Sequence, residues 1–113
     1  MNSRDRSRVD LLQGTLDLLI LRTLALEPRH GIAIADRIAQ ITRGTFDVRA
    51  GSLFPALHRL AQEGFIEGRW QPSPEGRRTK CYELTAAGRR QLEVEKRQWA
   101  RIVGAVGQVL ESE

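Results

Sequence analysis

The stretch from residue 50 to residue 64 constrains the fold of this chain most, because it joins a helical apolar stripe to an unusual polar face. At 100° per residue, four apolar side chains fall on one side of a helix, namely Leu53, Ala56, Leu57 and Leu60. The opposite side is small at its start, rich in hydrogen-bonding groups and free of acid until Glu63. It carries Gly51, Pro55, His58 and Gln62, flanked by Ser52 and Arg59. This pattern is typical of an ordinary surface helix, and its polar groups are also those that contact base edges and phosphates in a DNA major groove.

Length, charge and cysteine content narrow the class of protein. The 113 residues suffice for one domain with a modest core, and a net charge of +4 permits binding to a polyanion. The single cysteine, Cys81, excludes an internal disulfide, and two histidines argue against a structural zinc site, so no metal or cofactor is expected. Because Arg22 interrupts the longest apolar run and no signal peptide is evident, we expect a soluble cytoplasmic protein without membrane contact.

The first half of the chain predicts two helices and a short strand. Residues 11–26 are so dense in leucine that their helix must be buried on more than one side, and the surplus predicts contact with a second subunit. Residues 32–41 predict a short amphipathic helix, and residues 46–48 alternate enough for a very short strand. The polar residues 1–10 are interpreted as a flexible basic arm, with a DNA-gripping arm as the alternative.

The second half changes period after Gly64. Residues 65–71 and 80–84 predict two strands around a polar loop, and Thr85 is expected to cap a final helix from residue 86 to about residue 110. Three helices followed by a β-hairpin with a basic tip form a winged helix-turn-helix, in which the hairpin is the wing. The predicted fold class is therefore α+β, mostly α, with a winged helix-turn-helix domain at residues 11–85 and a long C-terminal dimerisation helix at residues 86–113.

Within this fold the basic residues acquire a role. Arg77, Arg78 and Lys80 lie on the return limb of the wing, where they are expected to hold phosphates beside the groove that the third helix enters. Taken alone they are a solvated charge run. The predicted DNA contacts are Ser52, Pro55, His58, Arg59, Arg77, Arg78 and Lys80.

Five short motifs occur in a fixed order between residues 11 and 99. They are residues 14–21 (GTLDLLIL), 30–31 (HG), 51–60 (GSLFPALHRL), 63–64 (EG) and 77–88 (RRxKxYxLTxxG, where x is any residue). Together they resemble PadR-type transcriptional regulators. The resemblance implies a dimeric winged-helix repressor whose third helix enters the major groove, and whose C-terminal helix packs against the first helix of the partner. The family commonly has tyrosine where this chain has Ile32 and Phe54, so no DNA contact is assigned to Ile32, and Phe54 is a packing or sugar-contact candidate.

The final helix carries a seven-residue apolar repeat that predicts a dimer independently of the resemblance. Leu92, Trp99 and Val106 recur every seven residues, with Ile102 and Val109 at the companion spacing. The predicted dimer interface comprises Leu16, Leu19, Leu92, Trp99, Ile102 and Val106. Some members of the resembling family bind aromatic compounds at this interface, which makes Trp99 and Ile102 candidates for an effector site, although Trp99 equally suits a residue that only fills the interface.

These observations favour a homodimeric repressor that binds double-stranded DNA at a pseudo-palindromic operator and is released by a small hydrophobic effector. The alternatives are a winged-helix module that docks on an acidic protein, and a constitutive DNA binder without a ligand. An enzyme is not expected, because the sequence has no nucleophile elbow, phosphate-binding glycine loop or metal-ligand spacing.

Overall fold

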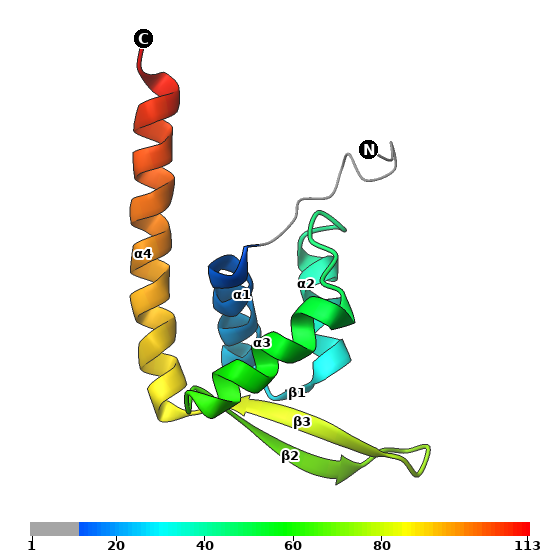
Figure 1. Ribbon diagram of the computed structural model, residues 1–113. Helices are drawn as coiled ribbons and strands as arrows, with labels where there is room; N and C mark the ends of the chain where they lie inside the picture. Colours follow the sequence, from blue (N-terminus) through cyan, green and yellow to red (C-terminus); the bar gives the residue numbers. More distant parts are fainter. Residues whose placement is uncertain (1–11) are drawn as a thin grey trace.

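The computed structural model describes residues 12–113, which form helices and a small antiparallel sheet. The helices are α1 (Gln13–Leu26), α2 (Gly31–Ile41), α3 (Ala50–Gln62) and α4 (Ala86–Glu111). The strands are β1 (Arg29–His30), β2 (Ile66–Pro72) and β3 (Arg78–Leu84), in the spatial order β1-β3-β2. Figure 1 shows α1, α2 and α3 grouped above the hairpin, with α4 rising along one side and past the end of the group. The winged helix-turn-helix prediction is confirmed, while the predicted arm at residues 1–10 lies outside the described residues.

The hydrophobic core lies between the three short helices and the sheet. Its large side chains are at most 8% exposed, and each stabilises the fold by roughly 2 kcal/mol through burial. They are contributed by α1, α2, α3, the hairpin and the first turns of α4: Leu16, Ile20, Leu21, Leu24, Ile34, Ile38, Leu53, Leu57, Leu60, Ile66, Tyr82, Leu84 and Leu92.

Two residues predicted for a dimer interface belong to this core instead. Leu16 is 4% exposed and Leu92 is 5% exposed within a single chain, so neither leaves surface for a partner. The reason is that the base of α4 packs back on α1, which absorbs part of the apolar surplus that the sequence suggested. Leu19 is half-buried against the same core.

The strand prediction for residues 46–48 was wrong. Phe46 and Val48 lie in the loop before α3, half-buried against the core, and the third strand is instead β1. It pairs Arg29 with Tyr82 and His30 with Cys81. Since β1 and β2 flank β3 at its base, the edge of β3 nearest the core is already paired by Arg29 and His30.

The recognition helix α3 begins at Ala50, as predicted, and therefore contains Pro55 in its second turn. The missing proline N–H falls on the exposed side of the helix, where the carbonyl it leaves unpaired is accessible to water. The helix ends at Gln62, and the chain turns away at Gly64, whose φ of +81° is the left-handed conformation that glycine adopts without strain. The amide of Phe65 then donates to the carbonyl of Leu60 at 3.0 Å, which turns the chain into β2.

One junction fixes the direction of both the wing and α4. Thr85 caps α4 by accepting a hydrogen bond from the amide of Gly88 at 3.0 Å, and its hydroxyl donates to the carbonyl of Gly64 at 2.6 Å. The amide of Thr85 also donates to the carbonyl of Phe65 at 3.1 Å. Gly88 approaches so closely that a Cβ there would lie 2.0 Å from the Phe65 oxygen, so only glycine fits. The end of α3, the base of the wing and the start of α4 are therefore held as one unit.

Candidate nucleic-acid interface

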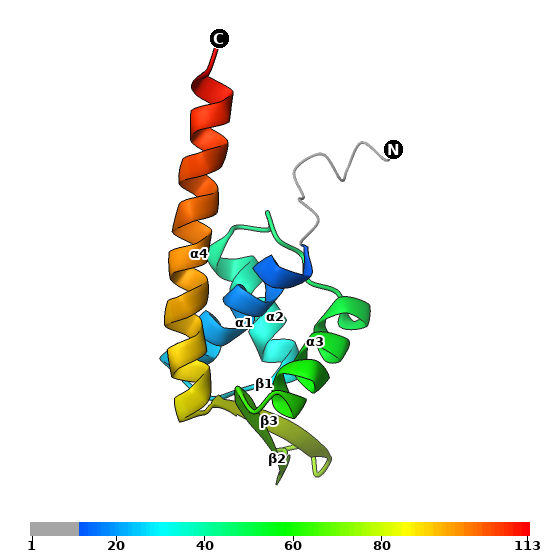
Figure 2. The ribbon, with the colours of Figure 1, turned by 60° about the vertical axis from the view of Figure 1, so that its left-hand side comes forward.

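The side of α3 that faces away from the core is exposed, and it is the polar side that the sequence predicts for contact with DNA. Leu53, Ala56, Leu57 and Leu60 face the core, which turns the opposite side of the helix to solvent. That side presents the hydroxyl of Ser52, the imidazole of His58 and the amide of Gln62, together with the ring of Pro55. It carries no carboxylate before Glu63. Figure 2, turned by 60° from Figure 1, shows α3 along one side of the domain, with the hairpin extending below it. This surface has the size and chemistry to enter a major groove.

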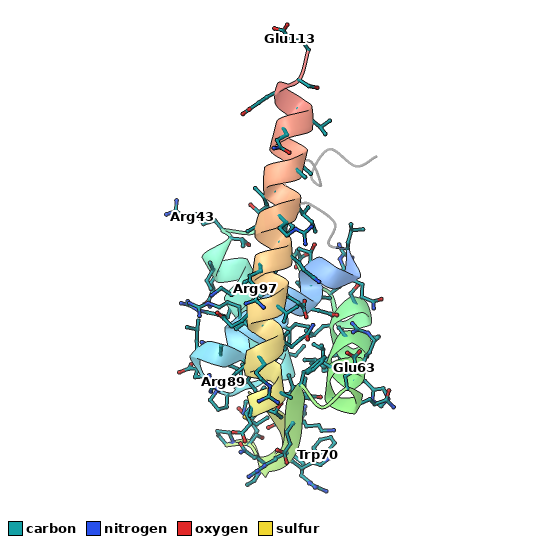
Figure 3. The ribbon with its side chains drawn as sticks, turned by 90° about the vertical axis from the view of Figure 1, so that its left-hand side faces the viewer. Arg43, Glu63, Trp70, Arg89, Arg97 and Glu113 are labelled. Carbon is teal, nitrogen blue, oxygen red and sulfur yellow. The ribbon has the colours of Figure 1, made fainter. Side chains whose placement is uncertain are left out.

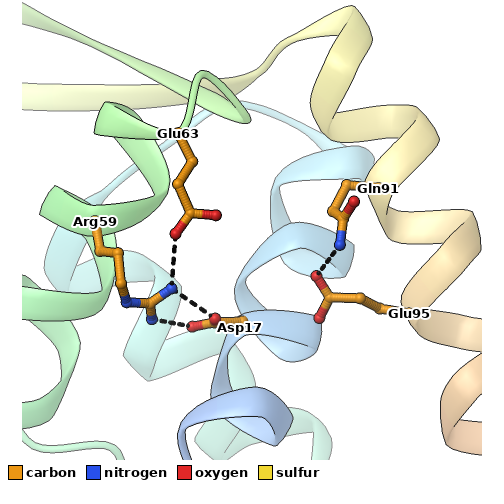
Figure 4. Close-up of polar contacts among 5 residues, drawn as sticks. All are labelled: Asp17, Arg59, Glu63, Gln91 and Glu95. Atoms are coloured by element: carbon orange, nitrogen blue, oxygen red, sulfur yellow. Dashed lines mark hydrogen bonds and ion pairs between the residues drawn. The ribbon is translucent and has the colours of Figure 1, made fainter.

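Arg59 has a different environment from its predicted neighbours. Its guanidinium donates two hydrogen bonds to the Asp17 carboxylate of α1, at 2.6 and 2.8 Å, and a longer one to Glu63 at 3.3 Å (Figure 4). The hydrogen bond from Arg59 to Asp17 raises the pKa of the guanidinium above its ordinary value, so this group stays charged. The structure thus gives Arg59 an intramolecular role that joins α3 to α1, and its predicted DNA contact stays a prediction.

The two faces of the wing differ sharply in charge. Paired residues of β2 and β3 point to the same side, and the side that starts at the buried pair Ile66 and Leu84 continues outward as an acid-free surface. We call this surface the inner face of the wing; beyond the core it carries Gly68, Trp70, Pro72, Arg78 and Lys80. The outer face carries Glu67 and Glu83, which lie 3.8 and 3.9 Å from Arg69.

Of the three predicted phosphate contacts on the wing, two come together. Arg78 and Lys80 share the inner face, whereas Arg77 is exposed at the end of the tip turn, its amide 3.2 Å from the Ser73 hydroxyl. Between Arg78 and Lys80 lies Trp70, with its ring centroid 5.3 Å from the Arg78 guanidinium carbon and 5.5 Å from the Lys80 ammonium. Trp70 was not among the predicted contacts, although its alternation with Ile66 and Gly68 along β2 was the signal that placed it on this face.

The predicted effector residues line a cavity between the start of α1 and the middle of α4. The cavity has a volume of about 300 Å³ and is walled mainly by apolar groups: Leu12, Gly14, Thr15, Leu18, Glu95, Gln98, Trp99 and Ile102. Its one carboxylate is half-buried, and burial raises the pKa of Glu95 above its ordinary value, while a hydrogen bond from Gln91 at 3.2 Å opposes the rise (Figure 4). Trp99 and Ile102 are 44% and 53% exposed at the cavity mouth.

The upper half of α4 carries an apolar stripe that no part of residues 12–113 covers. The stripe continues the side of the helix that packs on α1, and its members from the cavity mouth to the end of the helix are about half exposed or more: Ile102, Val103, Val106, Val109 and Leu110. Figure 3 views α4 from the side away from the domain, where the polar Arg89 and Arg97 project.

Residues 12–113 lack two other functional features. That part of the chain has no group of three histidine, cysteine or acidic side chains placed to hold a metal ion. It also has no helix that is both long enough and apolar enough to cross a bilayer.

Comparison with known proteins assigns the chain to a family. Residues 20–94 match the family model described as the transcriptional regulator PadR-like family. The structure of a PadR family transcriptional regulator from Eggerthella lenta is 30% identical, covers 89% of this chain and 86% of its own, and superposes with a TM-score of 0.79. A PadR-like transcriptional regulator from Bacillus cereus is also 30% identical, with 90% and 97% covered and a TM-score of 0.74. An uncharacterized protein from Lysinibacillus sphaericus is 28% identical over 84% of this chain and 87% of its own length. The chain thus belongs to the PadR-like family of DNA-binding transcriptional regulators.

Proposed function

We propose that this PadR-like regulator is a homodimeric repressor that binds a pseudo-palindromic operator and is released by a small hydrophobic effector. As a repressor of transcription it would act in the cytoplasm. The observation that carries the proposal is the combination of an acid-free reading surface, made by α3 and the inner face of the wing, with a bare apolar stripe on α4.

The DNA contacts divide by chemistry. Ser52, Pro55 and His58 on the exposed side of α3 meet base edges or phosphates in the major groove, and the wing arginines and Lys80 hold phosphates beside it. In a two-fold dimer, the two copies of α3 enter successive major grooves about 34–36 Å apart, which is one turn of DNA. Bound in this way over a promoter, the dimer blocks transcription.

Dimerisation is supported by the apolar surface that residues 12–113 of a single chain leave uncovered. A row of half-exposed valine, isoleucine and leucine side chains on a 26-residue helix is unfavourable in water, and a second copy of α4 offers a matching row. Leu16 and Leu92 are buried in the core and are no longer interface candidates. The remaining candidates are the half-buried Leu19 and the exposed Trp99, Ile102 and Val106.

The effector is proposed to bind in the cavity beside Trp99. An apolar cavity of about 300 Å³ with one aromatic wall and one carboxylate suits a small hydrophobic compound. Helix α1 connects the cavity to α3, because Gly14, Thr15 and Leu18 line the cavity and Asp17 of the same helix holds Arg59 of α3. A ligand that moves α4 relative to α1 changes the spacing of the two recognition helices and weakens binding to the operator.

The test uses the full chain and the duplex that lies upstream of its own coding sequence. Footprinting is expected to show two protected half-sites one helical turn apart, and gel shifts with a panel of aromatic compounds are expected to identify a ligand that raises the melting temperature and releases the DNA. With Trp70→Phe, Trp99 becomes the only tryptophan, so quenching of its emission places the ligand beside it. A single protected half-site contradicts the dimer, and feeble binding to any duplex at low salt favours the protein-docking alternative. A panel that weakens no complex favours a constitutive binder.

A further inference from the structure

The inner face of the wing holds a large aromatic side chain that the predicted phosphate contacts leave without a role. Trp70 is 58% exposed, and Figure 3 shows it on the hairpin at the end of the molecule opposite the C-terminus. An exposed indole forgoes one of the largest burial energies available to any residue, so a packing role within the chain does not account for it.

The surroundings of Trp70 are ordered by neighbouring side chains. Arg78 and Lys80 flank the ring at cation–π distances of 5.3 and 5.5 Å, and the Lys80 ammonium is also 5.9 Å from the ring of Tyr82. Gly68 makes this possible, because a Cβ there would lie 2.6 Å from Lys80 Cε and 3.0 Å from Tyr82 Cε1. The result is an aromatic ring that stays more than half exposed, with two cations held close to it.

This alternation corresponds to the chemistry of a nucleic-acid backbone, in which apolar sugar faces alternate with phosphates. We propose that Trp70 is a DNA-contact residue, whose indole packs on a deoxyribose beside the groove that α3 enters, while Arg78 and Lys80 hold the flanking phosphates. The inner face carries no acidic side chain, whereas the outer face carries Glu67 and Glu83. This difference in charge favours binding of the DNA backbone to the inner face alone.

The contact rests on the DNA-binding role proposed above and deepens it. It uses sugar and phosphate only, so it is independent of sequence and contributes to affinity at every site along a duplex. The alternative role for Trp70 involves no contact between the indole and DNA. In that role the ring only holds the two cations in place. The two roles differ in their dependence on salt, because ordering cations changes the number of counterions released, whereas packing on a sugar does not.

The first measurement uses Trp99→Phe, in which Trp70 is the only tryptophan of the chain. Binding to a fluorescein-labelled, random-sequence 40-bp duplex is followed by anisotropy at low salt, and acrylamide quenching of Trp70 is measured with and without the duplex. We expect the quenching constant to fall at least threefold when the duplex is saturated. Binding with unchanged quenching overturns the sugar contact, whereas no anisotropy change overturns DNA binding itself, so the two failures are distinguishable.

The second measurement compares Trp70→Ala, Trp70→Phe and Arg78→Ala over a range of salt concentrations. We expect Trp70→Ala to weaken binding about tenfold at every salt concentration without changing the slope, Trp70→Phe to lose less, and Arg78→Ala to make the slope shallower. A shallower slope for Trp70→Ala, equal to that of Arg78→Ala, shows that the ring only orders the cations and overturns the contact. Because Trp70 is exposed, these variants are expected to keep the melting temperature of the parent, which is checked first.

Discussion

At the scale of single residues, Arg59 illustrates how a side chain on the recognition helix is diverted to an internal partner. Its carboxylate partner Asp17 is only 12% exposed, so the carboxylate depends on the two hydrogen bonds from Arg59 for its stability. The same pair fixes the rotation of α3 on α1, and therefore which side chains the helix presents to DNA.

We expect Arg59→Ala to destabilise the protein by about 1–2 kcal/mol, less than the loss for a fully buried pair because the Arg59 side chain is 31% exposed. Adding Asp17→Asn removes the unpaired charge and is expected to restore part of that loss, as measured by urea denaturation of both variants. DNA affinity is measured on the double variant. A slope of log affinity against log salt that is shallower by about 0.9 there supports Arg59 as a phosphate contact, and a double variant that is less stable than Arg59→Ala contradicts the internal role.

Glu95 is the second residue with an environment that makes a measurable prediction. Burial, together with the negative charges of Asp17 and Glu63, raises the pKa of Glu95 in the folded protein above its ordinary value of 4.5. Since the folded state holds this proton more tightly than the unfolded state, the protein loses stability as pH rises from 4.5 through the raised pKa.

Glu95→Gln abolishes this titration. We expect the variant to melt at a higher temperature than the parent at pH 7.5, and the difference to shrink as the pH falls to 4. Glu93→Gln, two residues earlier at an exposed position, is the matched control, and its melting temperature should show no such dependence on pH. A stability gain for Glu95→Gln that does not vary with pH would show that packing, and not the charge, is responsible.

At the scale of elements, the wing is a two-sided hairpin whose inner face alone suits DNA. Removing a cation from the inner face should therefore differ from removing one from the outer face, although the net charge changes equally. We expect Arg78→Ala and Lys80→Ala each to weaken duplex binding several-fold and to lower the slope of log affinity against log salt by about 0.9 per lost phosphate contact. Arg69→Ala should leave both quantities close to those of the parent, and an equal effect of all three changes would indicate a general charge effect in place of a directed face.

The elements themselves were predictable to different degrees. The helices and the hairpin have strong periods and clear stop signals, and the Thr85 cap and the start of α3 at Ala50 are as expected. The two-residue strand β1 was missed, because it is too short for a period and forms only where β3 offers an edge, which is a tertiary effect. The same limit applies to Arg59, since residue spacing places it beside the polar face of α3 and contains no information about Asp17 on another helix.

At the scale of the whole molecule, α4 has two parts with different partners. Its first turns are clamped at Thr85 and Gly88 and packed on α1, whereas its last turns stand clear of the domain (Figure 1). The apolar stripe runs through both parts, from Leu92 in the core to Leu110 near the end, and Glu95 interrupts it beside the cavity. The same side of α4 thus serves the core of the single chain at its base and is available to a second chain above.

Because of that division, the proposed dimer can be disrupted without damage to the fold. We expect Val106→Glu, which places a charge in the bare part of the stripe, to convert the protein into a monomer in sedimentation equilibrium at micromolar concentration. Its melting temperature then becomes independent of concentration, because dissociation no longer accompanies unfolding. Arg97→Glu on the polar side of α4 is the control and should remain dimeric (Figure 3).

Since each monomer retains α3 and the wing, Val106→Glu should still bind duplex DNA weakly while losing the preference for two half-sites over one. If the Val106→Glu protein stays dimeric, the dimer interface does not lie on this stripe.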